Sequence, residues 1–311
     1  MTATLPPDLS ATVRTRRSAP ACTPVPDAIN STLGRKPFNE AYLRLDGWRR
    51  VSSAAQFDAV AEPTWTASLA DVVRRRAASQ QPAPSAIPGI LTEIVGHWVE
   101  ATDQHGVWWD AAAWRDGLAG TPLVGAVERV ADGLTLLSDR TLITREHVFS
   151  VRDRPIDLFV ASMAWGYGLS GYGWYRTRAL FGRDGSAQIP RLVGELQESA
   201  GSPERTWTVL RGSQGLRGLG PAFGTKIAYF AGYDRTEGCG PLIADRWTAW
   251  SFWALAGSWD IRASADLYRR YVETATSWAA EVGVRSDDLE RALFVAGPHV
   301  LRTWRALKSG R

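Results

Sequence analysis

The sequence has few of the residues that bind metal ions or form disulfide bonds. It contains only two cysteines, Cys22 and Cys239, so a four-cysteine zinc or iron–sulfur site is excluded. The four histidines do not have the spacing of a metal-binding helix; they are His97, His105, His147 and His299. A structural disulfide is improbable because Cys22 lies in a Pro-, Ser- and Thr-rich stretch at the N-terminus. We therefore expect no metal site and no cofactor.

Long apolar segments are missing as well. No run of about eighteen uncharged apolar residues is present, so no membrane span is predicted. The start of the chain lacks the compact apolar segment of a secretory signal. We expect a cytoplasmic, soluble protein and a monomer. Its 45% hydrophobic residues and fifteen tryptophans can form a sizeable core, and its net charge of +4 is compatible with a polyanionic partner without requiring one.

Helical patterns dominate the chain, and alternating strand patterns are scarce. Apolar residues recur at helical spacing in several segments, which are 67–78, 89–101, 155–164, 224–232, 246–256, 264–280 and 287–296. Ser202 followed by Pro203 predicts the start of a further helix, and Asp287 with Glu290 resembles a capping box. The best strand candidate is 145–151. We predict a mainly α fold with a flexible basic arm (1–35), a mostly helical N-terminal region (36–150) and a helical domain (151–311).

Residues 216–253 contain the most informative pattern, a Gly- and Pro-containing turn between two helices. Gly218, Gly220 and Gly224 allow a close backbone approach and expose amides at a helix start, where a phosphate is favoured. An ordinary corner between two helices would have the same glycines, so this pattern alone leaves both interpretations open.

Lys226 and Asp245 add chemistry to this segment. We expect Lys226 in the first turn of the following helix, where the helix dipole opposes a cation. Together with the neighbouring Tyr229 and Phe230, this position favours the neutral, nucleophilic amine. Asp245 follows nineteen residues later, just before an apolar helix. Its position is typical of an N-cap, and a capping carboxylate is held rigidly enough to act in electrostatic catalysis.

The segment GPAFGTKIAYF with its following Asp resembles the helix-hairpin-helix DNA glycosylases, and most closely their 8-oxoguanine glycosylase branch. The family hairpin reads LPGVGTK, so Pro221, Gly224 and Thr225 match hairpin positions. The resemblance implies that Lys226 is the nucleophile and Asp245 the catalytic aspartate. It also implies two packed helical subdomains with the active site in the cleft between them, and double-stranded DNA with a damaged or modified base as the partner.

The sequence departs from the family pattern at several positions. Ala222 replaces the first hairpin glycine, and Ile-Ala precedes Asp245 where relatives have Pro-Val. Trp247 stands where many relatives have His, and Phe230 where the 8-oxoguanine enzymes have a pocket Cys. These departures leave the excised base open, including a larger modified base such as one in phage DNA.

A second Gly- and aromatic-rich segment, 159–181, contains a turn between two helices and then Arg176 and Arg178. In the family, the equivalent turn supplies the side chains that fill the gap left by the extruded base. Tyr167, Leu169 and Tyr172 are the candidates for this wedge, and packing in the core is the alternative. The candidates that could enclose the base are Phe230, Trp247, Trp165 and Trp174. With the hairpin residues, Arg176 and Arg178 are the predicted DNA contacts.

The sequence therefore favours a DNA glycosylase, with AP lyase activity implied by the lysine. Two alternatives remain. A noncatalytic helix-hairpin-helix protein would use the hairpin only to bind DNA phosphates, and a helical protein unrelated to DNA would contain the motif by coincidence.

Overall fold

The computed structural model describes residues 65–78, 87–99, 106–134, 136–137, 140–182, 184–213, 215–257 and 261–309. The predicted N-terminal arm lies outside these ranges. The described chain divides into two compact units: residues 65–99 and 244–309 belong to unit 1, and residues 106–243 belong to unit 2. The domain boundary predicted near residue 150 thus falls inside unit 2.

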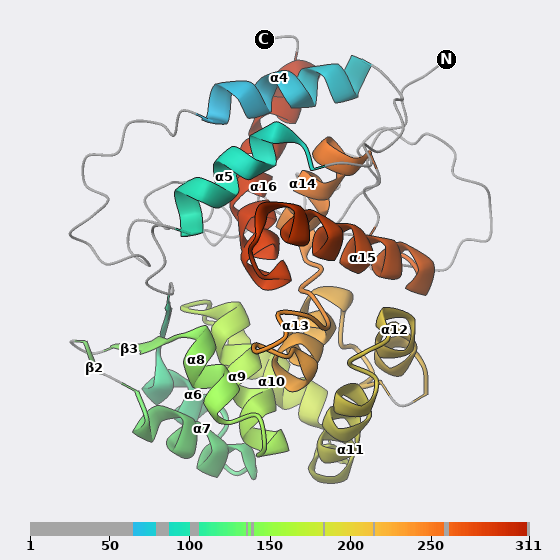
Figure 1. Cartoon of the computed structure of the whole chain (residues 1–311). Coiled ribbons are helices and arrows are strands. Elements are labelled where there is room, and N and C mark those ends of the chain that lie inside the picture. The colour runs from blue at the N-terminus through green and yellow to red at the C-terminus, as the bar shows by residue number, and fades with distance from the viewer. Residues whose placement is uncertain are drawn as a thin grey trace. The chain divides into compact units, whose positions relative to one another are not determined.

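Unit 2 is a helical unit with one small sheet (Figure 1). Its strands pair antiparallel in the order β1-β3-β2, with Val107 opposite Ile143 and Leu136 opposite Thr141. The elements are β1 (Val107–Trp109), α6 (Ala111–Gly117), α7 (Leu123–Asp132), β2 (Leu136–Leu137), β3 (Arg140–Ile143), α8 (Arg145–Ser150), α9 (Pro155–Tyr167), α10 (Gly173–Phe181), α11 (Gly185–Glu198), α12 (Pro203–Arg211) and α13 (Pro221–Gly232).

Helix α9 lies at the centre of unit 2. It packs against α7, α8, α10, α11 and α13, and every residue from 157 to 164 is buried. Pro155 is its first residue, as predicted, because a helix start needs no N–H there. The helix extends to Tyr167, three residues beyond the predicted end, and Gly168 follows with a φ of 55°. Its buried middle is therefore part of the core of unit 2, whereas residues 165–167 at its C-terminal end are half-buried.

The predicted strand 145–151 is wrong, since residues 145–150 form helix α8. Thr144 caps this helix by accepting a hydrogen bond from the His147 amide. The buried positions are Arg145, Val148 and Phe149, which follow the three- and four-residue spacing of a helix.

Unit 1 consists of helices α4 (Trp65–Ala78), α5 (Gly89–Val99), α14 (Arg246–Ala256), α15 (Ala265–Val282) and α16 (Ser286–Lys308). Helix α14, predicted with the observed bounds, packs along α16, and the Ser251 hydroxyl donates to the Leu293 carbonyl at 2.5 Å. None of the helices in the described ranges is long and apolar enough to cross a membrane.

The predicted start of α16 needs correction. The helix begins at Ser286 with Arg285 as N-cap, so Asp287 lies inside the first turn and does not form a capping box with Glu290. Instead, the Asp287 carboxylate accepts a hydrogen bond from Arg285 Nε at 3.0 Å. The helix also continues past the predicted end at 296 and includes Pro298.

Candidate active site

The helix-hairpin-helix of unit 2 consists of α12, the turn from Gly212 to Gly220, and α13. Gly218 has a φ of 89°, a conformation that favours glycine, and Gly220 is the N-cap of α13. Gly224 lies inside α13, where a Cβ would be only 3.1 Å from the Leu210 side chain of α12. Gly218 therefore shapes the turn, whereas Gly224 permits the close packing of its two helices.

Lys226 lies one turn further into the helix than predicted. Because α13 begins at Pro221, Lys226 is its sixth residue, and the dipole effect decreases within the first turn. Thr225, just before it, is buried and donates from its hydroxyl to the Pro221 carbonyl at 2.9 Å. The surroundings of the Lys226 amine are thus set by tertiary packing more than by the helix end.

Two aromatic rings flank the Lys226 amine. Its Nζ lies 6.0 Å from the Trp165 ring centroid and 5.6 Å from that of Phe223, and the residue is only 7% exposed. Trp165 comes from the end of α9 and Phe223 from the first turn of α13. Both ring faces can attract a cation at these distances. The lysine is therefore held in an aromatic site.

Gly166 lets α9 and α13 approach each other at this place. A Cβ on Gly166 would lie 2.5 Å from Phe223 Cε1 and 3.2 Å from Lys226 Cδ. A larger residue would consequently push into both the lysine and one of its flanking rings.

A buried arginine, Arg145, also contacts this aromatic site. The guanidinium of Arg145 is 5.3 Å from the Trp165 ring and 5.0 Å from the Tyr229 ring, and it donates to the Tyr229 hydroxyl at 3.2 Å. Phe230, fully buried, packs edge-on against Trp165 at 5.3 Å. Trp165 thus connects two cations and a predicted pocket residue.

Three residues of this site were not predicted from the sequence: Arg145, Phe223 and Gly166. Phe223 could have been found because it stands in the hairpin motif directly before Gly224. Arg145 carries no such signal, since nothing in the local sequence distinguishes a buried arginine from an exposed one. Gly166 is one of several glycines in its segment, and only the packing partner separates it from the others.

Asp245, in unit 1, is the N-cap of α14, as its position before an apolar helix predicts. Its Oδ1 accepts hydrogen bonds from the amides of Trp247 at 2.8 Å and Thr248 at 3.1 Å. The Thr248 hydroxyl accepts in return from the Asp245 amide at 2.9 Å, which completes a capping box. The carboxylate is 7% exposed and fixed by its own helix.

Trp247 lies next to this cap and is 6% exposed. The Arg246 guanidinium stacks over its ring at 4.2 Å. A Cβ on Gly297 of α16 would lie 2.4 Å from the Trp247 carbonyl oxygen and 2.7 Å from its Cα. Gly297 therefore allows α16 to contact the backbone of the first turn of α14.

The wedge candidates of unit 2 differ in exposure. Tyr167 stacks on Phe223, with ring centroids 4.2 Å apart, and burial raises the pKa of its hydroxyl although Arg176 opposes this shift. Leu169 and Tyr172 are 46% and 41% exposed. Trp174, which was predicted as a base-pocket candidate, packs over Gly117, where a Cβ would lie 2.2 Å from the indole. Tyr167 thus supports the lysine site, and only Leu169 and Tyr172 face outward.

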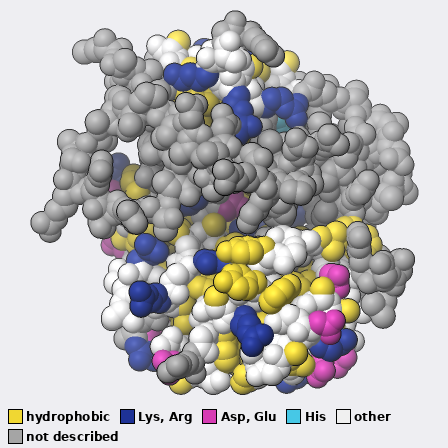
Figure 2. Space-filling model, turned by 180° about the vertical axis from the view of Figure 1, so that it is seen from behind, with side chains coloured by type: hydrophobic (Ala, Val, Ile, Leu, Met, Phe, Trp, Pro, Cys, Tyr) yellow, Lys and Arg dark blue, Asp and Glu magenta, His cyan; other side chains and the backbone are white. Residues whose placement is uncertain are grey.

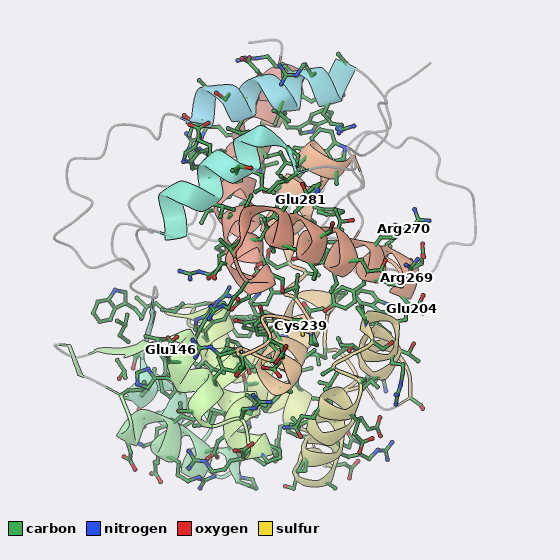
Figure 3. The ribbon with its side chains drawn as sticks, viewed as in Figure 1. Glu146, Glu204, Cys239, Arg269, Arg270 and Glu281 are labelled. Atoms are coloured by element: carbon green, nitrogen blue, oxygen red, sulfur yellow. The ribbon has the colours of Figure 1, made fainter. Side chains whose placement is uncertain are left out.

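The arginines around the hairpin bind backbone carbonyls. Arg176 donates to Gly218, Arg178 to Gly117 and Arg211 to Leu219, at 3.2–3.4 Å. No acidic residue occurs in 158–183 or in 205–233. On α15, by contrast, Arg269 and Arg270 (labelled in Figure 3) form ion pairs with Asp266, and Arg269 also pairs with Glu273. Unlike on α15, positive charge around the hairpin and α10 is therefore not compensated by acidic residues nearby in the sequence.

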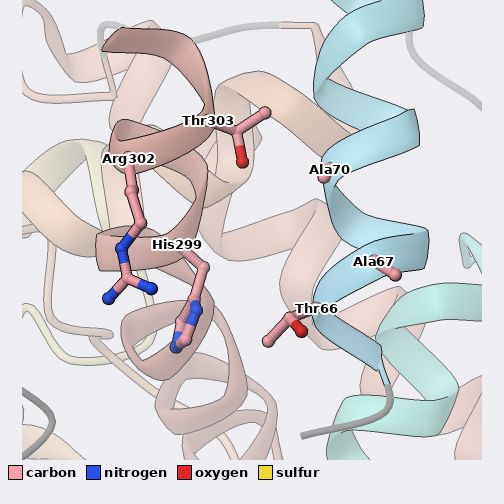
Figure 4. Close-up of a pocket in the computed structure, with 6 residues that line it drawn as sticks. All are labelled: Thr66, Ala67, Ala70, His299, Arg302 and Thr303. Atoms are coloured by element: carbon pink, nitrogen blue, oxygen red, sulfur yellow. The ribbon is translucent and has the colours of Figure 1, made fainter. Parts of the chain in front are cut away.

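A small surface hollow of about 190 Å³ lies in unit 1 between α4 and α16 (Figure 4). It is lined by Thr66, Ala67, Ala70, His299, Arg302 and Thr303, none of which the sequence predicts as a site residue. Over the described residues, no group of three His, Cys, Asp or Glu side chains could hold a metal ion.

Comparisons with known proteins give one match. A family model described as "Putative 8-oxoguanine DNA glycosylase OGG-like protein" matches residues 100–294, more than half of the chain, including Lys226 and Asp245. Neither the curated proteins nor the solved structures gave a match. The match confirms the resemblance and the mainly α glycosylase fold predicted from the sequence. The chain therefore belongs to the OGG-like family of DNA glycosylases, whose substrate is DNA.

Proposed function

We propose that this chain is a DNA glycosylase with AP lyase activity that excises a damaged or modified base, with Lys226 as nucleophile and Asp245 as electrostatic catalyst. The observation that carries the proposal is the aromatic site of Lys226, at the hairpin position where the family has its nucleophile. A surface lysine that only contacts phosphate would not need to be 93% buried between two rings.

The proposed reaction begins with an extruded nucleotide, at a cost of a few kcal/mol for unpairing and unstacking. The bond between C1′ and the base breaks, its electron pair leaves with the base, and positive charge develops on the sugar. The carboxylate of Asp245 stabilises this charge. Because its own helix already orients the carboxylate, little reorganisation is needed during the reaction.

After the Lys226 amine has lost a proton, its lone pair forms a bond to C1′. Loss of a second amine proton and opening of the sugar ring give a Schiff base. Removal of a C2′ proton and departure of the 3′ phosphate complete β-elimination and break the strand. The rings of Trp165 and Phe223 support this step because they limit the positions that the amine can adopt.

Several further residues are assigned to DNA binding in this proposal. Gly218, Gly220 and Pro221 shape a helix start that suits a phosphate, while Gly224 lets α12 and α13 pack closely behind it. The arginines around the hairpin supply positive charge. Arg176 and Arg178 are proposed as phosphate contacts. Leu169 is the wedge candidate that its exposure supports best, since Tyr167 is stacked on Phe223.

Trp165 and Phe230 of unit 2 are proposed to line the base pocket, and Trp247 of unit 1 is proposed separately as a contact of the base. Phe230 fills space beside Trp165 where relatives that excise 8-oxoguanine have a smaller Cys, so the pocket is shaped differently. The excised base is therefore to be found with a panel of oxidised, alkylated, deaminated and glycosylated bases in duplex DNA.

Borohydride trapping tests the proposal directly. The sequence has only three lysines, Lys36, Lys226 and Lys308, so an adduct is easily assigned. Wild type and Lys308→Gln should form a covalent adduct with duplex containing an abasic site, and Lys226→Gln should form none. Equal adducts in all three proteins would refute the nucleophile assignment. Absence of both adduct and base release across the panel would favour a noncatalytic binding protein.

A further inference from the structure

The turn between α9 and α10 and the first turn of α10 contain an unusual exposed patch. Leu169, Tyr172 and Tyr175 are 46%, 41% and 53% exposed, and they are three of the four large hydrophobic residues that are exposed in the described chain. Figure 2 shows hydrophobic side chains gathered on the viewed face of unit 2, with Lys or Arg side chains beside them. Single exposed apolar residues are common, but three within seven positions indicate a binding surface.

The inner face of α10 fixes the outward direction of the two tyrosines. Gly173 packs so closely that a Cβ would lie 2.6 Å from the Trp114 ring and 2.8 Å from Tyr167 Cβ. Thr177 is fully buried and donates to the Gly173 carbonyl at 2.9 Å. With these positions inside, Tyr172 and Tyr175 lie together on the outer face, three residues apart. The patch is therefore preorganised, which lowers the entropic cost of binding a ligand.

The chemistry of the patch matches nucleic acid. The Arg176 guanidinium lies 5.9 Å from the Tyr172 ring and also donates to the Gly218 carbonyl, so it links the patch to the hairpin turn. Arg178, two residues beyond Arg176 on the same helix, is exposed, and the whole segment 158–183 has no acidic residue. Aromatic faces beside uncompensated arginines are the combination that binds single strands, in which bases stack on rings and phosphates contact cations.

The geometry of the two rings favours unpaired over paired bases. Their centroids are 5.5 Å apart and the rings are tilted by 37°, so they do not cover each other as a parallel stack would. Bases in a duplex strand are stacked about 3.4 Å apart and their faces are hidden. In an extended single strand, successive bases can separate and expose their faces.

We infer that Tyr172 and Tyr175 form a binding site for single-stranded DNA, on which two successive unpaired bases stack while Arg176 and Arg178 contact the phosphates. The inference rests on DNA as the partner, which follows from the family, and not on the chemistry of Lys226. It adds a function to the glycosylase: the enzyme holds unpaired DNA, such as a bubble or gap, next to its hairpin.

The test compares the affinities for a labelled twelve-nucleotide oligo(dT) and for an unmodified duplex of the same length, by fluorescence anisotropy with the full chain. Tyr175→Ala should weaken binding of the single strand about tenfold and change duplex binding less than threefold, because one stacked base contributes about 1–3 kcal/mol. Tyr175→Phe keeps the ring and should restore the affinity. Leu307→Ala removes an exposed leucine in unit 1 and should have no effect.

Each result decides the inference. Unchanged single-strand affinity in Tyr175→Ala would overturn it and leave the patch to a protein partner. Equal losses for both DNA forms would overturn it too, since the patch would then serve duplex binding. Lys226→Gln separates this inference from the proposed function, because it should abolish the borohydride adduct and retain oligo(dT) binding.

Discussion

The surroundings of Lys226 in unit 2 differ in kind from those of Asp245 in unit 1. The amine is flanked by rings from two different helices, Trp165 on α9 and Phe223 on α13, whereas the carboxylate is bound by amides of the helix that it caps. The first arrangement depends on how helices pack, and the second depends mainly on one helix start.

This difference determines whether a substitution can change the chemistry of the site without changing its local structure. At Asp245 the charge can be removed while the cap is kept, because asparagine caps a helix as well as aspartate does. At Lys226 the surroundings can be altered only by moving a neighbouring helix or ring.

The largest effect is expected from Asp245→Asn. The amide oxygen still accepts from Trp247 and Thr248, so the melting temperature should change little. Base release should decrease about 100- to 1,000-fold because the negative charge that stabilises the sugar is lost. The matched control is Asp110→Asn, at the N-cap of α6, which should keep full activity. A large loss of stability in Asp245→Asn, or unchanged base release, would contradict the separation of cap and catalyst.

Gly297→Ala should disturb the packing of α16 against the first turn of α14, the helix that Asp245 caps. The added methyl would meet backbone atoms of Trp247, which cannot move away as a side chain can. We expect a loss of about 3 kcal/mol in the free energy of unfolding, measured by urea denaturation. Gly96→Ala, in α5 of the same unit, has nothing within 4 Å of the added methyl and should gain up to about 1 kcal/mol. Equal changes in both variants would show that α16 does not constrain α14 here.

Gly166→Ala tests how the packing of α9 against α13 positions Lys226. Its methyl meets a ring edge and a flexible lysine stem, so the cost in stability should be smaller, about 1–2 kcal/mol. Because Phe223 and Lys226 must both shift, the rate of borohydride trapping should decrease about tenfold. Gly194→Ala, in α11 with open space around the methyl, serves as the control within unit 2. A normal trapping rate in a destabilised Gly166→Ala protein would mean that the rings do not position the amine.

The same contrast explains what could be predicted from the sequence. The N-cap position of Asp245 and the bounds of α14 were predicted correctly because a capping residue before a short apolar run is a local signal. The aromatic site was not, since Trp165 and Phe223 are far apart in the chain and meet only when α9 packs on α13. Residues 145–150 were mistaken for a strand because a segment of six residues contains too few turns to define a period.

Local signals also failed where tertiary packing overrides them. Gly297 and Pro298 are typical of a helix end, yet α16 continues through both. Gly297 is required there for contact with α14, and the surrounding residues Ala296, Val300 and Leu301 are buried. Helix α13 was predicted to begin at residue 224, three residues too late. It begins at Pro221, which suits the first helical position, and it continues through Gly224.

The smallest effect concerns acid and again separates the two units. In unit 1, burial and, to a smaller extent, the positive charge of Arg302 together lower the pKa of His299 to about 4. In the unfolded chain a histidine titrates near 6.5, so below that pH the unfolded state binds a proton that the folded state does not. Unit 1 should therefore be fully stable above pH 6.5 and lose stability as the pH falls toward 4, by about 1 kcal/mol between pH 7.5 and 5.5.

His299→Gln should remove this part of the acid sensitivity when urea midpoints are compared at the two pH values. Since α16 carries both His299 and Gly297, protonation of His299 should weaken the helix that supports Asp245. An acid sensitivity that His299→Gln leaves unchanged would place its origin elsewhere.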